Sequence, residues 1–156
     1  MPGSPPVSRA LDALKIPYRL FQHSGPVTSL EQAARERGQQ PEQVIRSLVF
    51  RMGAGEYVMV LMAGAQQAAW KTLRKTLGQS RLTMASEAEL LQATGYEIGA
   101  VAPFGLPRPM RILADAGVFA PEEISLGSGV RGTAVIMKSA DLRRALGEVE
   151  VGRFGE

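Results

Sequence analysis

Two nearly continuous apolar runs, SLVFRM (47–52) and YVMVLMA (57–63), are separated by the turn GAGE. Apolar runs of this length around a glycine-containing turn are typical of a β-hairpin. A strand with one face in water alternates apolar and polar residues, and these two runs do not alternate. We therefore expect a hairpin at the centre of a sheet that is covered by other elements on both faces.

The rest of the chain supplies helices and shorter strands. Ser29 and the pair Ser86–Glu89 are expected to cap the starts of two helices, and Ser139 to cap the last one. In all, about seven strands and five helices form hairpins flanked by helices rather than βαβ repeats. This order predicts an α+β fold with a mixed, mainly antiparallel β-sheet wrapped by helices. The length of 156 residues predicts a single domain over residues 1–156.

The composition excludes several classes of site. The chain has no cysteine and one histidine, His23, so neither a zinc centre nor a Ser-His-Asp triad is expected. His23 is expected to be a partly exposed residue at the end of a strand. No apolar segment is long enough for a signal peptide or a membrane span, which predicts a cytoplasmic protein without a membrane partner.

The segment TGYEIGAVAPFG (94–105) combines three glycines and a proline with the large apolar residues Tyr96, Ile98, Val101 and Phe104. An ordinary surface loop would carry small polar residues instead. A loop held rigid by its own apolar side chains can present bare backbone amides, and such amides can hold a carbonyl oxygen or an oxyanion. The alternative is a packed structural loop without a ligand.

The segment GSGVRG (127–132) matches the glycine spacing of dinucleotide-binding loops, but the β-branched run TAVIM follows it. A dinucleotide loop must open a helix, so we interpret this segment as a strand-to-strand turn. Consecutive amides in such a turn can also form a nest that binds an anion.

The segment WKTLRKTLG (70–78) is expected to be a helix with Lys71, Arg74 and Lys75 on one face and Leu73 and Leu77 on the other. A solvated helix face explains the three cations. With a nucleic-acid partner, the same face would contact phosphates.

Several segments together resemble the YbaK family, the family of the prolyl-tRNA-synthetase-associated editing domain. They are PEQVIRSLVFR, YVMVLMAG, TGYEIGAVAPFG, ILAD, ISLGSGVRG and SADLRRALGEVEVG, in this order. The resemblance extends from about residue 11 to residue 152, and TGY-x-x-G-x-x-x-PFG is its most specific part. It implies a mixed sheet wrapped by helices.

The resemblance also implies trans-editing, which is hydrolysis of the ester of a tRNA charged with a wrong small amino acid, such as alanine or cysteine on the tRNA for proline. The implied partners are the aminoacylated end of tRNA and, in some settings, an aminoacyl-tRNA synthetase; no metal or organic cofactor is implied. Together with the patterns above, it assigns catalysis to Arg46, Gly99, Ala100 and Val101, substrate binding to Pro103, Phe104, Asp115, Gly127, Ser128 and Gly129, and tRNA binding to Lys71, Arg74 and Lys75.

Arg46 departs from the family pattern V-x-K-[ST]-L-V, which has lysine at this position. Arginine carries the same charge on a planar fork but stays protonated, so it cannot accept a proton. Ala68 and Ala69 stand where many members carry an acidic residue before the helix. The alternative function is therefore a module that binds aminoacyl-tRNA or an amino acid without hydrolysing it.

Overall fold

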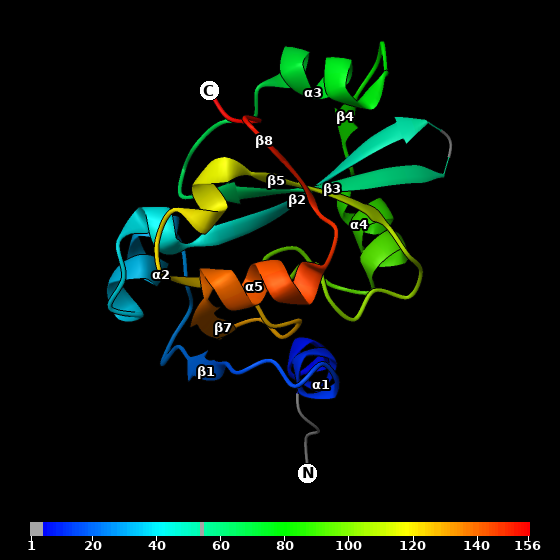
Figure 1. Cartoon of the computed structure of the whole chain (residues 1–156). Coiled ribbons are helices and arrows are strands. Elements are labelled where there is room, and N and C mark those ends of the chain that lie inside the picture. Colours follow the sequence, from blue (N-terminus) through cyan, green and yellow to red (C-terminus); the bar gives the residue numbers. More distant parts are fainter. Residues whose placement is uncertain (1–4, 54) are drawn as a thin grey trace.

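The computed structural model describes residues 5–53 and 55–156; Ala54, in the expected hairpin turn, lies outside this part. The predicted mixed α+β fold is confirmed (Figure 1). The α-helices are α1 (Pro6–Ala13), α2 (Leu30–Glu36), α3 (Trp70–Leu77), α4 (Glu87–Thr94) and α5 (Ser139–Leu146), and the 3-10 helices are η1 (Pro41–Gln43) and η2 (Ala116–Phe119). The strands are β1 (Arg19–Gln22), β2 (Ile45–Gly53), β3 (Glu56–Ala63), β4 (Thr83–Met84), β5 (Arg111–Asp115), β6 (Glu123–Gly127), β7 (Thr133–Lys138) and β8 (Glu150–Gly152).

The strands are divided between two sheets. Five strands lie in the order β4-β2-β3-β5-β8, with antiparallel pairing up to β3 and parallel pairing beyond it. The other three lie in the order β1-β7-β6 and are antiparallel. In Figure 1, α3 lies at the top, above the five-stranded sheet, and α1 and α5 lie below it beside the three-stranded sheet. The short strand β8 was not predicted, because three residues carry no periodic signal.

The β2–β3 hairpin is covered on both faces, as its apolar sequence predicts. Met59 and Leu61 of β3 belong to one buried cluster, which also contains residues of α1, β6 and β7. Val58, Val60 and Met62 alternate with them and belong to a second cluster, which contains residues of α3. Successive side chains of a strand point to opposite faces, so one strand serves two cores.

The predicted helix caps are confirmed at two positions, and the prediction is wrong at a third. Ser29 and Ser86 accept hydrogen bonds from the backbone amides of Gln32 and Glu89, as predicted. The prediction for Ser139 is wrong. It is the first residue of α5 rather than its cap, and its hydroxyl donates to the carbonyl of Pro121. The competing acceptor comes from a segment that is distant in sequence.

His23 is buried, which corrects the expectation of a partly exposed residue. Its Nδ1 lies 2.7 Å from Glu36 Oε1, while Arg37 Nε donates to its Nε2 over 3.1 Å. Because Nε2 accepts, the ring proton lies on Nδ1, and the hydrogen bond from His23 lowers the pKa of Glu36. Arg37 also donates to Ser125 Oγ, so the network joins α2 to β6.

Asp115 closes β5 and anchors the end of the chain. Its Oδ1 accepts from the amides of Phe154 and Gly155, at 2.8 and 3.2 Å, and its Oδ2 accepts from the amide of Gly117 at 2.9 Å. The carboxylate is buried, and all these partners are backbone groups. The structure therefore gives Asp115 a supporting position.

Replacing Asp115 by alanine is expected to lower the free energy of unfolding by about 2 kcal/mol, because the buried amide of Phe154 and the half-buried amides of Gly155 and Gly117 lose their acceptor. Urea denaturation measures this change. Asp115→Asn keeps one carbonyl oxygen and should lose less. Equal stability of Asp115→Ala and the wild type would contradict the anchoring role.

None of the helices among the described residues is long and apolar enough to span a membrane.

Candidate active site

The segment 95–105 leaves α4 and folds back on itself around one tyrosine. Gly95 ends α4 in the left-handed conformation. Tyr96 is then buried, and its hydroxyl donates to the carbonyl of Phe104, at the other end of the loop. Burial raises the pKa of the Tyr96 phenol, which therefore stays protonated and continues to donate. Tyr96 thus closes the loop on its core side.

Most amides of the loop donate to no group in the described part of the chain, namely those of Glu97, Ile98, Gly99, Val101, Ala102, Phe104 and Gly105. The amide of Ala100 donates to the carbonyl of Glu97 at 3.0 Å, whereas those of Gly99 and Val101 donate to no group in residues 5–53 and 55–156. Gly99 is exposed and Val101 is half-buried, so both amides can be reached from outside. Gly99 has a φ of 88°, which other residues rarely adopt. The loop therefore offers backbone hydrogen-bond donors without a charged side chain.

The turn after β6 lies directly against this loop. The amide of Gly129 donates to the carbonyl of Ala100 over 3.0 Å. A Cβ on Gly127 would lie 2.5 Å from the Val101 carbonyl oxygen, so only glycine allows this approach. Ser128 is buried, and its hydroxyl donates to the carbonyls of Val130 and Thr133. Ser128 and the amide of Gly129 therefore stabilise the turn and the loop.

The mutation Tyr96→Phe is expected to loosen the loop while preserving its apolar packing. Loss of the hydroxyl leaves the buried Phe104 carbonyl without this donor, so the free energy of unfolding should fall by about 1 kcal/mol. Any activity that depends on the Gly99 and Val101 amides should fall with it. Urea denaturation and single-turnover kinetics measure the two effects. The control is Tyr18→Phe, because the Tyr18 hydroxyl donates to exposed Asp12; similar effects of both mutations would contradict the prediction.

Arg46 lies on β2, and its hydrogen bonds go to the segment that follows β3. Val44, directly before β2, forms a parallel bridge with Ser125 inside β6. Arg46 and Gly127 each lie two residues beyond this bridge, on β2 and β6. The half-buried guanidinium donates to the carbonyls of Gly64, at 2.6 Å, and Gln66. Burial lowers the pKa of Arg46, although arginine remains protonated. Arg46 thus holds the segment that follows β3.

Pro103 and Phe104 are both buried. Phe104 packs in the core with Tyr96, which gives it a supporting position. Pro103 borders an open cavity of about 360 Å³ that continues along the exit of the loop. The cavity is lined by Pro103, Leu106, Pro107, Arg108, Pro109, Met110 and Ile112.

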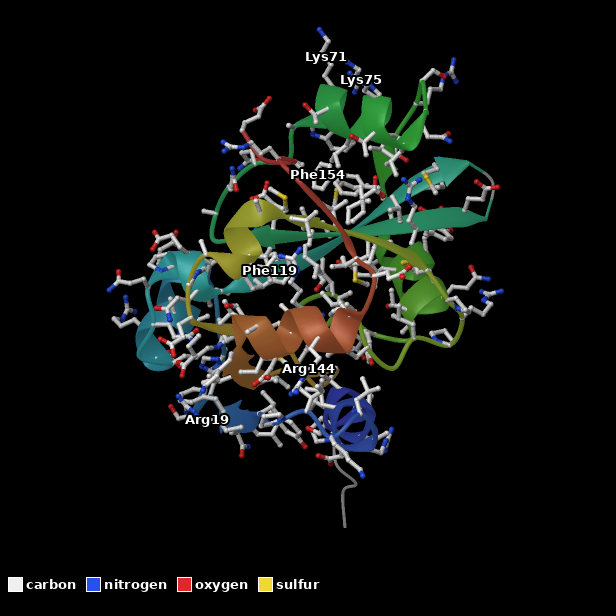
Figure 2. The ribbon with its side chains drawn as sticks, viewed as in Figure 1. Arg19, Lys71, Lys75, Phe119, Arg144 and Phe154 are labelled. Carbon is white, nitrogen blue, oxygen red and sulfur yellow. The ribbon has the colours of Figure 1, made fainter. Side chains whose placement is uncertain are left out.

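The cations of α3 lie on the other side of the five-stranded sheet. Leu73 and Leu77 of α3 pack in the cluster that contains Val60, whereas Tyr96 and Phe104 pack in the cluster that contains Leu61. Figure 2 shows Lys71 and Lys75 projecting from α3 away from the body of the molecule. The structure therefore brings Gly127 against the 99–103 loop, and it places Lys71, Arg74 and Lys75 apart from both.

Sequence reasoning missed the closing role of the Tyr96 hydroxyl and the engagement of the Ala100 amide. The apolar residues of the loop indicated that it is packed, but no local signal identifies which amides find acceptors. In the described part of the chain, no three histidine, aspartate or glutamate side chains are placed to share a metal ion.

Comparison with known proteins gives the family. The model of the "Aminoacyl-tRNA editing domain" matches residues 24–145. The multifunctional Ser/Thr-tRNA deacylase ProXp-y of Escherichia coli K12 is 30% identical over 131 residues, which cover 81% of this chain and 78% of the deacylase. The proline–tRNA ligase of Thermosipho melanesiensis is 32% identical over 100 residues, which are 64% of this chain but 17% of the ligase.

Solved structures show the same fold at low sequence identity. The hypothetical protein APE2540 superposes with a TM-score of 0.88 at 21% identity, covering 97% of this chain and 99% of that one. A candidate trans-editing enzyme for prolyl-tRNA synthetase superposes with a TM-score of 0.84 at 22% identity, covering 99% of both chains. The match of the family model over most of the chain, together with this fold, shows that the chain belongs to the family of aminoacyl-tRNA editing domains.

Proposed function

We propose that this protein, acting as one editing unit over residues 1–156, is a trans-editing deacylase that hydrolyses the ester of tRNA mischarged with a small amino acid. The observation that carries the proposal is the set of amides, those of Gly99 and Val101 on either side of Ala100 among them, that donate to no group of the described residues in the loop most specific to the family. The E. coli relative, named a Ser/Thr-tRNA deacylase, supports the substrate class.

The proposed chemistry needs no nucleophilic side chain. Water, positioned with the help of a ribose hydroxyl, attacks the ester carbonyl carbon. The negative charge that develops on the carbonyl oxygen is stabilised by the Gly99 and Val101 amides. The bond to the ribose oxygen then breaks, that oxygen takes a proton, and the amino acid and the tRNA are released. An aminoacyl ester is reactive enough that positioning and charge stabilisation carry this step.

The other residues have proposed roles that follow from their places. Gly127 allows the turn to approach the loop, and Tyr96 keeps the loop closed. The positive charge of Arg46 attracts the terminal nucleotide, while its fork holds the segment after β3. Pro103 borders the cavity next to the proposed ester site. Lys71, Arg74 and Lys75 contact tRNA phosphates, and a synthetase is a proposed source of the substrate.

Single-turnover deacylation tests this function. The substrates are tRNAs charged with alanine, cysteine, serine, threonine or proline, incubated with excess protein. We expect at least one small mischarged amino acid to be released faster than in buffer, and correctly charged prolyl-tRNA to remain intact. Absence of hydrolysis across the panel, with tRNA binding intact, would reject the proposal.

One observation favours the alternative of a binding module without hydrolysis. Arg46 replaces the lysine of the family pattern, and its guanidinium is already hydrogen-bonded to Gly64 and Gln66. Under this alternative, Arg46→Lys gains hydrolysis while tRNA affinity stays unchanged. Under the proposed function, wild-type protein is the more active of the two.

A further inference from the structure

A second cavity, of about 460 Å³, lies at the edge of the five-stranded sheet, away from the loop. The ladder between β2 and β4 ends at the pair Arg51–Thr83, and the two segments part beyond this pair. The cavity that they leave is called here the edge pocket, and it is lined by Arg51, Met52, Gly53, Arg81, Leu82 and Thr83. No role described so far uses it.

The residues that line the edge pocket belong to both faces of the sheet. Met52 packs against the cluster that contains α3, and Leu82 is buried in the same cluster. Arg51 follows Phe50 and turns to the other face, where its NH1 donates to Glu89 of α4 at 3.1 Å. The pocket therefore lies where a ligand can pass from the α3 side of the sheet to the side on which the 99–103 loop packs.

The edge pocket has a cationic excess: Arg51 and Arg81 line it, Arg51 is paired with Glu89, and Glu56 lies opposite Gly53 in the β2–β3 register. Among the ion pairs of the described residues, none includes Lys71, Arg74, Lys75 or Arg81. Arg81 is exposed, and no acidic residue occurs between positions 71 and 81. Glu89 forms an ion pair with Arg51, and the Arg51 side chain remains 48% exposed in this pair. Two arginines above an apolar floor suit a phosphate attached to a base or sugar.

The position of the pocket indicates which part of a tRNA could reach it. Arg46 and Arg51 are five residues apart on β2, which corresponds to about 17 Å at the rise of a strand. This distance excludes the nucleotide that carries the ester at the proposed site, but it suits a nucleotide further along the same acceptor arm.

From these observations, and resting on the proposed function, we propose that the edge pocket binds a phosphate-bearing nucleotide of the tRNA acceptor arm, upstream of the esterified end. It continues the contacts of Lys71, Arg74 and Lys75 around the sheet edge toward the 99–103 loop. The pocket contributes to affinity for the RNA and takes no part in hydrolysis.

The test measures binding of uncharged tRNA as a function of salt concentration for the full chain and two variants. Arg81→Ala removes the uncompensated charge. Gly53→Trp fills the pocket without a change of charge, and a Cβ at Gly53 meets no atom within 4 Å. The control is Lys138→Ala, which removes an exposed cation from β7.

We expect Arg81→Ala and Gly53→Trp to weaken binding about fivefold, a loss of about 1 kcal/mol. For Arg81→Ala, the slope of log K against log salt should decrease by about 0.7–0.9, the value for one lost phosphate contact. Lys138→Ala should leave both quantities unchanged. If Arg81→Ala or Gly53→Trp behaves like Lys138→Ala, the edge pocket is not a nucleotide site.

Kinetics separate this inference from the proposed function. With mischarged tRNA, Arg81→Ala should raise KM and leave kcat unchanged. With a 3′-aminoacyl-adenosine, which is too short to reach the edge pocket, it should match the wild type. A changed kcat, or an equal loss with the short substrate, would overturn the inference while leaving the deacylase function in place. Failure of the wild type to hydrolyse any mischarged tRNA would instead reject the deacylase function, and the binding measurement would still decide the pocket.

Discussion

Gly127→Ala is expected to reduce kcat/KM for deacylation by about 100-fold, because a displacement of about 1 Å in positioning groups has an effect of this size. The added Cβ would lie 2.5 Å from the Val101 carbonyl oxygen and 3.0 Å from that of Ala100. Both contacts are with backbone, which cannot rotate away as a side chain can. The loop must therefore move, and the Gly99 and Val101 amides move with it. Single-turnover hydrolysis of mischarged tRNA measures the effect.

The stability of the Gly127→Ala variant should also fall, by about 1–3 kcal/mol, as overpacked sites do. Urea denaturation shows whether the variant is folded at the temperature of the assay. Gly25→Ala is the matched control, because no atom lies within 4 Å of its added Cβ and its φ is not positive. Undiminished hydrolysis by folded Gly127→Ala would contradict the assignment of the ester to this loop.

Arg46→Ala is expected to slow deacylation by about 100-fold, because a substrate end that is misplaced by about 1 Å reacts more slowly by a factor of this size. It removes a positive charge and two donors to the segment that follows β3. Arg46→Lys keeps the charge but loses the planar fork, so it should retain more activity than alanine and less than arginine. Rates at saturating protein, compared across wild type, lysine and alanine, measure the order.

Stability and hydrolysis, measured separately, distinguish the two effects of Arg46→Ala. In Arg46→Ala the carbonyls of Gly64 and Gln66 lose their donor. The free energy of unfolding should therefore fall by about 1–3 kcal/mol, which urea denaturation measures. Removal of one cation far from the proposed site, as in the control Arg35→Ala, should change neither stability nor hydrolysis. If Arg46→Ala hydrolyses as fast as the wild type, Arg46 serves the fold alone.

Most local elements of this protein could be predicted from sequence because their signals are local. The Ser86–Glu89 capping box forms as its spacing predicts, and Gly78 ends α3 in the left-handed conformation. The apolar hairpin is covered on both faces, as its lack of alternation indicates. Ser139 and His23 were predicted wrongly, because each side chain bonds to a segment that is remote in sequence.

The candidate site shows the same limit. Sequence indicated that residues 99–103 form a rigid apolar loop and that its backbone is the functional part. It could not show that the carbonyl of Glu97 accepts from the amide of Ala100, or that Arg46 binds the carbonyls of Gly64 and Gln66. Nor could it show that the Gly99 and Val101 amides find no acceptor among the residues that the structure describes. These outcomes depend on which acceptors the folded chain brings within hydrogen-bonding distance.

The sequence by itself determined the helices, the hairpin, the family resemblance and the candidate loop, since periodicity, capping and glycine placement act over a few residues. Only the tertiary structure decided that the strands divide into two sheets and that Gly127 meets Val101. It also decided that the α3 cations lie on the opposite face from the loop. The reason is physical: alternation assigns a side chain to one of two faces, but long-range packing decides what each face covers.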